Sequence, residues 1–112
     1  MIVYNLSDMF KGWFVGDFKK SAYRTSDCEV AVKSYSKGDV EDAHYHKIAT
    51  EITLIQSGKV IMFDRVHDSG DIIVVEPGDV TAFVALEDTI TIVVKVPSVI
   101  GDKYNVELER LK

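Results

Sequence analysis

The fold class that this sequence of 112 residues predicts is an all-β barrel, sandwich or jelly roll. No stretch keeps apolar residues at the i, i+3, i+4, i+7 spacing of an amphipathic helix over three turns. Short runs rich in Val, Ile, Phe and Thr recur instead along the chain, and Gly, Asp, Ser and Pro separate them. A spacing of about ten residues between such runs, with tight turns, is typical of antiparallel all-β domains.

Each predicted strand is a short run of β-branched and aromatic residues that turn residues bound on both sides. Trp13-Phe14-Val15 is a predicted short strand near the N-terminus. The main runs follow in chain order: EVAVKSY at 29–35, EITLIQ at 51–56, KVIMF at 59–63, DIIVV at 71–75, VTAFVA at 80–85 and TITIVVKV at 89–96. We expect turns between them at Ser57-Gly58, Asp68-Ser69-Gly70-Asp71, Pro77-Gly78-Asp79 and Glu87-Asp88.

A single domain is expected, because the length is close to the usual domain size and 46% of the residues are apolar. We expect a barrel core over about 30–96, an N-terminal strand or arm over 1–28, and a C-terminal tail over 97–112 that acts as a lid or as a surface strap. Trp13, Phe14 and Phe18 exceed what a small barrel can shield. They therefore predict a homodimer.

Charge and hydropathy exclude two kinds of partner. The chain has 13 Lys and Arg against 18 Asp and Glu, a net charge of −5 at pH 7, with both signs interleaved, which argues against nucleic-acid binding. No apolar stretch reaches the roughly 20 residues of a membrane helix, and the N-terminus lacks the pattern of a secretion signal. Cys28 is the only cysteine. We therefore expect a cytoplasmic protein without a membrane or nucleic-acid partner.

The sharpest chemical feature is the pair His44 and His46, followed by Glu51. Side chains at i and i+2 of a strand project to the same side, so the two imidazoles form a bidentate start to a metal site. A short bend would bring the Glu51 carboxylate to the same point. Two histidines and one carboxylate suit Fe(II), and also Mn, Ni, Co or Zn. The alternative at this point is that both histidines are ordinary surface residues.

The glycines on either side of this cluster narrow the interpretation. The pattern G-x5-H-x-H-x4-E-x6-G is met at every position from Gly38 to Gly58, and it resembles the first signature motif of the cupin superfamily. The resemblance covers about residues 30–96. It implies a small jelly-roll barrel, or double-stranded β-helix, with the three ligands of the first motif pointing inward, which agrees with the all-β prediction.

The second cupin motif is only partly present. Gly70 and Gly78 keep their spacing, but Glu76 stands where the family has Pro, Thr81 where it has a third His, and Ala85 where it has Asn. A threonine hydroxyl is a poor ligand for a divalent ion. The resemblance therefore implies either three protein ligands with open positions, or a metal-free barrel in which a histidine serves as acid or base.

The metal-free alternative has a precedent in a second resemblance. His44-Tyr45-His46-Lys47 looks like the HxHK segment of the dTDP-sugar 3,4-ketoisomerases, small dimeric cupins that use histidine to move protons on a keto-sugar. The preceding segment, Asp39-Val40-Glu41-Asp42, is acidic where that family is rich in arginine. If this acidic segment faces the pocket, it disfavours a highly phosphorylated ligand.

Three functional classes follow: a metal-dependent enzyme of dioxygenase or isomerase type acting on a small polar organic molecule, a metal-free sugar isomerase, and a binding or sensing module without chemistry. His46 and Glu51 are the catalytic candidates. Thr53, Thr81 and Phe83 are the predicted pocket residues. Three other residues are expected to face solvent: Lys33, Lys95, and His67 at a polar hairpin tip.

Overall fold

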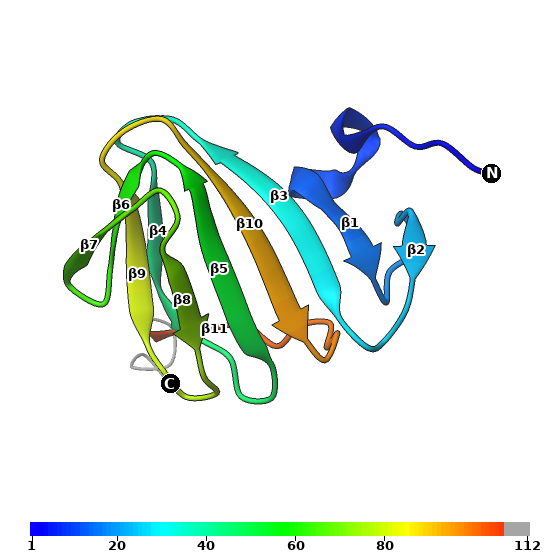
Figure 1. The fold of residues 1–112 in the computed structure, drawn as a ribbon. Coiled ribbons are helices and arrows are strands. Elements are labelled where there is room, and N and C mark those ends of the chain that lie inside the picture. Colours follow the sequence, from blue (N-terminus) through cyan, green and yellow to red (C-terminus); the bar gives the residue numbers. More distant parts are fainter. Residues whose placement is uncertain (107–112) are drawn as a thin grey trace.

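Two antiparallel β-sheets face each other in the computed structural model, which describes residues 1–106 (Figure 1). The predicted all-β jelly-roll class, a double-stranded β-helix, is confirmed. The described residues form two short 3-10 segments, η1 Leu6–Asp8 and η2 Phe10–Gly12. The strands are β1 Trp13–Gly16, β2 Tyr23–Arg24, β3 Glu29–Tyr35, β4 Val40–Tyr45, β5 Thr50–Ser57, β6 Lys59–Met62, β7 Arg65–Asp68, β8 Ile72–Val75, β9 Thr81–Ala85, β10 Thr89–Val96 and β11 Tyr104–Asn105.

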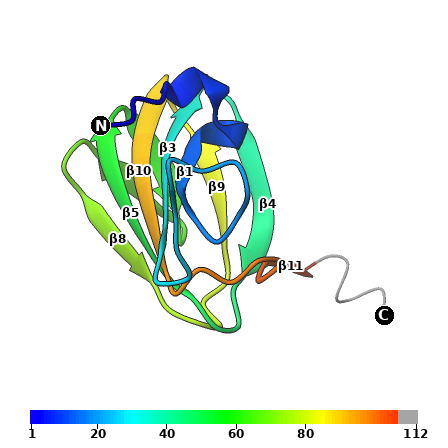
Figure 2. The ribbon, with the colours of Figure 1, turned by 90° about the vertical axis from the view of Figure 1, so that its right-hand side faces the viewer.

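The sheets interleave distant parts of the chain. The first has the order β2-β1-β3-β10-β5-β8 and the second the order β11-β4-β9-β6-β7. All pairs are antiparallel except β1 with β2. In Figure 2, β5, β8 and β10 stand on one side, and β4 and β9 on the other. Alternate residues of each strand therefore point into the space between the sheets.

The six main predicted strands and the short N-terminal one are confirmed with shifts of one residue at several ends. Strand β6, which follows Gly58, pairs with β7, and the prediction missed β7. It placed His67 at a polar hairpin tip, but His67 lies on β7, half-buried, with its Nε2 3.0 Å from the Met62 carbonyl oxygen. The β6–β7 turn is at Phe63 and Asp64, which both have positive φ, and the predicted turn at Asp68-Ser69-Gly70-Asp71 follows β7, with the Asp71 amide donating to the Asp68 carbonyl oxygen at 3.0 Å. The short polar sequence RVHD gave no strand signal of its own.

Gly58 ends the first glycine-bounded motif, and it has a structural reason to be glycine. Its φ is 100°, and a Cβ there would lie 2.3 Å from Thr89 Oγ1 and 2.6 Å from the Asp88 carbonyl oxygen. The predicted turn between β5 and β6 therefore passes directly against the start of β10. A side chain at this position would push the β5–β6 turn away from the start of β10.

The apolar core fills one half of the space between the sheets. Its members come from β5, β6, β8 and β9, and Tyr35 and Phe63 pack against them. They are Ile55, Val60, Met62, Ile73, Val75, Phe83 and Ala85. Burial of these side chains holds the two sheets together, and the other half of the interior is left to polar residues.

The described part of the C-terminal tail is a strap that is anchored to the barrel. Asp102 is buried, and its carboxylate accepts hydrogen bonds from the amides of Lys47, Ile48 and Ala49 at 2.9–3.1 Å. Strand β11 pairs with β4, and Tyr104 stacks on Tyr45. The strap therefore fixes the loop that follows the histidine pair. The rest of the predicted tail, 107–112, lies outside the described residues.

No helix among residues 1–106 is long and apolar enough to cross a membrane.

Candidate functional site

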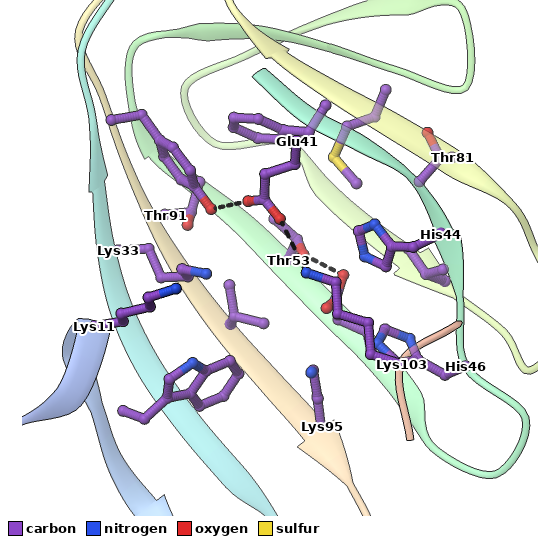
Figure 3. Close-up of a pocket in the computed structure, with 17 residues that line it drawn as sticks. Lys11, Lys33, Glu41, His44, His46, Thr53, Thr81, Thr91, Lys95 and Lys103 are labelled. Carbon is purple, nitrogen blue, oxygen red and sulfur yellow. Dashed lines mark hydrogen bonds and ion pairs between the residues drawn. The ribbon is translucent and has the colours of Figure 1, made fainter. Parts of the chain in front are cut away.

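A cavity of about 230 Å³ lies between the sheets, beside the apolar core (Figure 3). Strands of both sheets line it. All six side chains that the sequence singled out for the site lie in its wall: His44, His46, Glu51, Thr53, Thr81 and Phe83. The structure thus brings together the predicted ligand set and the predicted pocket residues.

Strand geometry explains why the two histidines share this cavity. His44 lies near the end of β4, opposite Thr81 of β9, and the β4–β9 register shifts between Glu41 and His44. His46 follows directly after β4, and its side chain is turned to the same cavity. The two imidazole rings lie 5.6 Å apart between centroids and meet edge to face at 79°. The i, i+2 spacing therefore places both imidazoles on the same side of the chain, as predicted.

His44 is held in one orientation by the backbone. Its Nδ1 lies 2.8 Å from the Asp42 carbonyl oxygen. Since a carbonyl can only accept a hydrogen bond, Nδ1 donates in this contact, and Nε2 is the ring nitrogen left for a ligand. This pattern, one ring nitrogen donating to a carbonyl and the other free, is that of a metal-binding or proton-accepting imidazole.

His46 is the most unusual side chain in the wall. It is 2% exposed, and neither ring nitrogen has a hydrogen-bond partner among the described residues. Burial lowers the pKa of His46 to about 4, and the charges of Lys95 and His44 act in the same direction. The imidazole is therefore neutral near pH 7. Buried polar atoms in native proteins normally have partners, so these nitrogens point to a bound species.

Glu51 enters the cavity from β5, on the opposite sheet. Its Oε2 accepts a hydrogen bond of 3.2 Å from Thr53 Oγ1, and its partners across the sheet are Lys95 of β10 and Val75 of β8. Within residues 1–106, no three His, Cys, Asp or Glu side chains form a ready-made metal-ligand group. Glu51 thus shares a cavity with the imidazoles without joining them in a preformed cluster.

Thr81 and Phe83 line the cavity mainly through packing. The Thr81 hydroxyl donates to the Ala82 carbonyl oxygen at 2.7 Å and accepts from the Phe63 amide at 2.8 Å. These two backbone contacts occupy most of its hydrogen-bonding capacity. Phe83 packs on the Tyr35 ring, with 4.4 Å between centroids. Thr81, at the position of the missing third histidine, therefore serves the fold of the hairpin that precedes it.

Sequence reasoning missed the cationic part of the wall. Lys33 and Lys95 were expected to face solvent, but both line the cavity, together with Lys11 and Lys103. In Figure 3 their side chains reach the same space from different elements. In the structure Lys33 lies on the same strand face as the buried Ala31, and Lys95 on that of the buried Val93. The sequence did not show this, because the opposite faces of both strands carry Val or Ile as well.

The acidic segment 39–42 behaves differently from its expected role. Only Glu41 of this segment lines the cavity, where it accepts a short hydrogen bond from the Tyr35 hydroxyl and lies 3.9 Å from Lys103 Nζ. Burial acts to raise the pKa of Glu41, but the Tyr35 hydrogen bond and the charges of Lys33 and Lys103 outweigh it and lower the pKa. The condition of the prediction, that the acidic segment faces the pocket, is therefore met by Glu41 alone, and Lys103 lies beside this carboxylate.

Trp13 also has a different place from the one expected. The sequence suggested that it belongs to an apolar patch of a subunit interface, but it lines the cavity instead. Its ring lies 5.8 Å from Lys33 Nζ and 5.0 Å from Lys95 Nζ. The exposed apolar side chains nearest the N-terminus are others, Met1, Ile2, Val3, Tyr4, Leu6 and Phe10.

Several solved structures share this architecture. An uncharacterized conserved protein with a double-stranded β-helix domain from Klebsiella pneumoniae is 23% identical, with a TM-score of 0.68, over 74% of this chain and 73% of that chain. An RmlC-like cupin from Shewanella frigidimarina is 19% identical, with a TM-score of 0.59, over 65% and 68%. The DMSP lyase DddQ from Ruegeria pomeroyi is 16% identical, with a TM-score of 0.70, over 84% of this chain and 49% of that chain. No protein-family model and no curated protein sequence matches the chain.

Proposed function

Because this chain has the cupin fold, we propose that its barrel cavity holds a divalent transition metal and that the protein binds or transforms a small polar organic molecule there. His44, His46 and Glu51 are the proposed ligands, and Fe, Mn, Ni, Co and Zn all suit two imidazoles and a carboxylate. A dioxygenase-like or isomerase-like reaction fits such a site. Fold alone does not decide the reaction, so the proposal rests on the site.

The observation that carries this proposal is the environment of His46. Two unpartnered ring nitrogens lie in a buried wall, and a neutral imidazole is the form that binds a metal. His44 supplies a second imidazole 5.6 Å away, with its Nδ1 held by a carbonyl. The donor set therefore fits a first-row divalent ion, while Glu51 would complete it from the facing strand.

A bound metal would act as a Lewis acid that polarises a carbonyl or activates oxygen. The chain's own residues would do the rest. Glu51 would take a proton from the substrate where it is not itself a ligand, His46 would do so only in a metal-free site, Thr53 would steady the Glu51 carboxylate through its hydrogen bond, and the apolar wall around Phe83 would exclude water. The Tyr35 hydroxyl donates a hydrogen bond to the Glu41 carboxylate in the same wall. Burial and this hydrogen bond raise the pKa of Tyr35.

Elemental analysis of protein purified without a metal-affinity tag tests the proposal. We expect close to one first-row divalent ion per chain. A folded protein that contains no metal, and that takes up none when Zn, Ni, Co, Mn or Fe(II) is added, would contradict it. That result would favour the metal-free alternative, in which the neutral His46 is the base of a sugar isomerase, or a binding module without chemistry.

The homodimer is a further part of the proposal, as is a cytoplasmic location. Six apolar side chains near the N-terminus are exposed, from 44% for Leu6 to 114% for Met1, and a symmetric partner is the usual way to cover such a patch. Light scattering should give twice the mass of one chain. A monomer at concentrations of about tens of micromolar would refute the dimer.

A further inference from the structure

The cavity wall carries an excess of positive charge. Lys11, Lys33, Lys95 and Lys103, which we call the lysine cluster, stand against two carboxylates, Glu41 and Glu51, among the described lining residues. They come from four separate parts of the chain: η2, β3, β10 and the segment before β11. Leaving the histidines out of the count, the wall has two more positive charges than negative ones. Lys11 and Lys103 are exposed to solvent, whereas Lys33 and Lys95 are half-buried, where an ammonium group is unfavourable without a counter-charge, so these two point to an external anion.

Three members of the cluster have no carboxylate partner in the described part of the chain, and two of these, Lys33 and Lys95, are half-buried. Across residues 1–106, Lys103 is the only cluster member with a carboxylate oxygen within 4.0 Å, namely Glu41 Oε2 at 3.9 Å. Lys33 and Lys95 instead face the Trp13 ring. Burial lowers the pKa of Lys33, and the charges of Lys103 and Lys95 add to this effect, against the opposing charge of Glu41. An anion beside Trp13 would relieve this repulsion.

A polar atom on the deep wall also lacks a partner. Thr91 is 1% exposed, and its Oγ1 has no hydrogen-bond partner among the described residues, although it lines the cavity. Thr91 is the partner of Lys33 across the β3–β10 pair. Lys33, Lys95 and this hydroxyl therefore come from two neighbouring strands of the first sheet, β3 and β10, and Figure 3 shows them on the same side of the cavity. A buried hydroxyl in such a position normally binds something.

We propose that the ligand of this cavity is a small organic anion whose charged oxygens bind Lys33 and Lys95 beside Trp13, and whose inner end hydrogen-bonds to Thr91. The inference rests on the proposed function and deepens it, since it assigns the substrate class of the same site: Lys95 is the cross-strand partner of Glu51, so the anion would lie next to the proposed metal ligands. The cavity volume of about 230 Å³ is below the roughly 300–1,000 Å³ of sites for drug-sized ligands. The ligand is therefore small.

Calorimetric titration of metal-stripped protein tests this assignment. The probes are succinate, inorganic phosphate and the uncharged analogue succinamide, at matched ionic strength. We expect one of the two anions to bind and succinamide not to bind, and the tighter anion identifies the ligand as a carboxylate or a phosphate ester. In a Lys33→Met/Lys95→Met double variant, the affinity should fall by at least about tenfold.

Matched variants keep the test sharp. Lys20→Met/Lys37→Met removes the same charge from exposed positions and should bind like the wild type, and Lys33→Arg/Lys95→Arg should retain most of the affinity. Wild-type affinity in the Lys33→Met/Lys95→Met variant, equal binding of succinamide, or no binding of either anion up to about 20 mM would overturn the assignment. Anion binding that requires metal and ignores both lysines would also overturn it, while leaving the metal proposal intact.

Discussion

Replacing Asp102 with alanine should lower the free energy of unfolding by about 3 kcal/mol. Its buried carboxylate accepts three backbone hydrogen bonds, from Lys47, Ile48 and Ala49. The substitution removes an ionised acceptor and leaves the fully buried Ala49 amide without a partner. Because these amides follow His46 directly, the loop that holds this imidazole loosens as well. Urea denaturation measures the effect, with Asp27→Ala, an exposed aspartate, as the control.

The contribution of Asp102 should also depend on pH. Burial acts to raise its pKa, but the three amide hydrogen bonds outweigh burial and hold the pKa below the ordinary value of 3.8. A carboxyl group with a lowered pKa stabilises the fold fully above the unfolded value and loses that contribution as the pH falls through the folded one. The difference between wild type and Asp102→Asn should therefore be constant at neutral pH and shrink below about pH 3.8. A difference that grows on acidification would contradict this account.

Replacing His44 and His46 together with glutamine should abolish metal retention. Both nitrogen ligands of the proposed site are lost, and loss of even an outer-shell partner of a metal ligand typically costs roughly 10–100-fold in affinity. We expect the variant to keep less than about a tenth of the wild-type metal after dialysis. The third histidine offers a matched control, because His67 lies on β7 and is absent from the cavity wall.

His67→Gln should retain wild-type metal content. Circular dichroism shows whether the double variant is folded, and Glu51→Gln serves as a milder second test, since an amide keeps the shape of the side chain but is a weaker ligand. The ligand assignment is wrong if the folded double variant still retains metal.

The strands could be predicted because most of them are local runs of β-branched residues between turn residues. The histidine pair and Glu51 could be placed in one cavity because an i, i+2 spacing and a motif fixed by its glycines are both readable along the chain. β4 was harder, since VEDAHY mixes charged residues on both faces. It was not among the predicted runs, and the argument from the histidine spacing assumed a strand there.

The prediction that Lys33 and Lys95 face solvent was wrong for a physical reason. On β10 the outward positions are as apolar as the inward ones: Ile90, Ile92 and Val94 face outward, while Thr89, Thr91, Val93 and Lys95 face inward. Hydropathy therefore did not show which face of the strand points inward. The prediction relied on the general preference of lysine for solvent, and this was wrong here. Charged groups inside a barrel are uncommon, and here they mark the site.

Asp102 was beyond prediction for another reason. Its partners lie 53–55 residues earlier in the chain. No local sequence pattern near Gly101 indicates a hydrogen bond to residues that far away. Trp13 is similar, because only the pairing of β1 with β3 brings it beside Lys33 and Lys95. Asp102 and Trp13 therefore reach the site only through long-range contacts, which a local sequence pattern does not predict.

The most direct test of the central claim, a metal held by two imidazoles inside this barrel, is X-ray absorption spectroscopy of the zinc-loaded wild-type protein. The account predicts imidazole scattering from two histidines, with nitrogen ligands at about 2.0–2.1 Å and oxygen ligands at a similar distance. A bound zinc ion whose spectrum lacks imidazole scattering, or an imidazole signature that persists unchanged in the His44→Gln/His46→Gln variant, would contradict it.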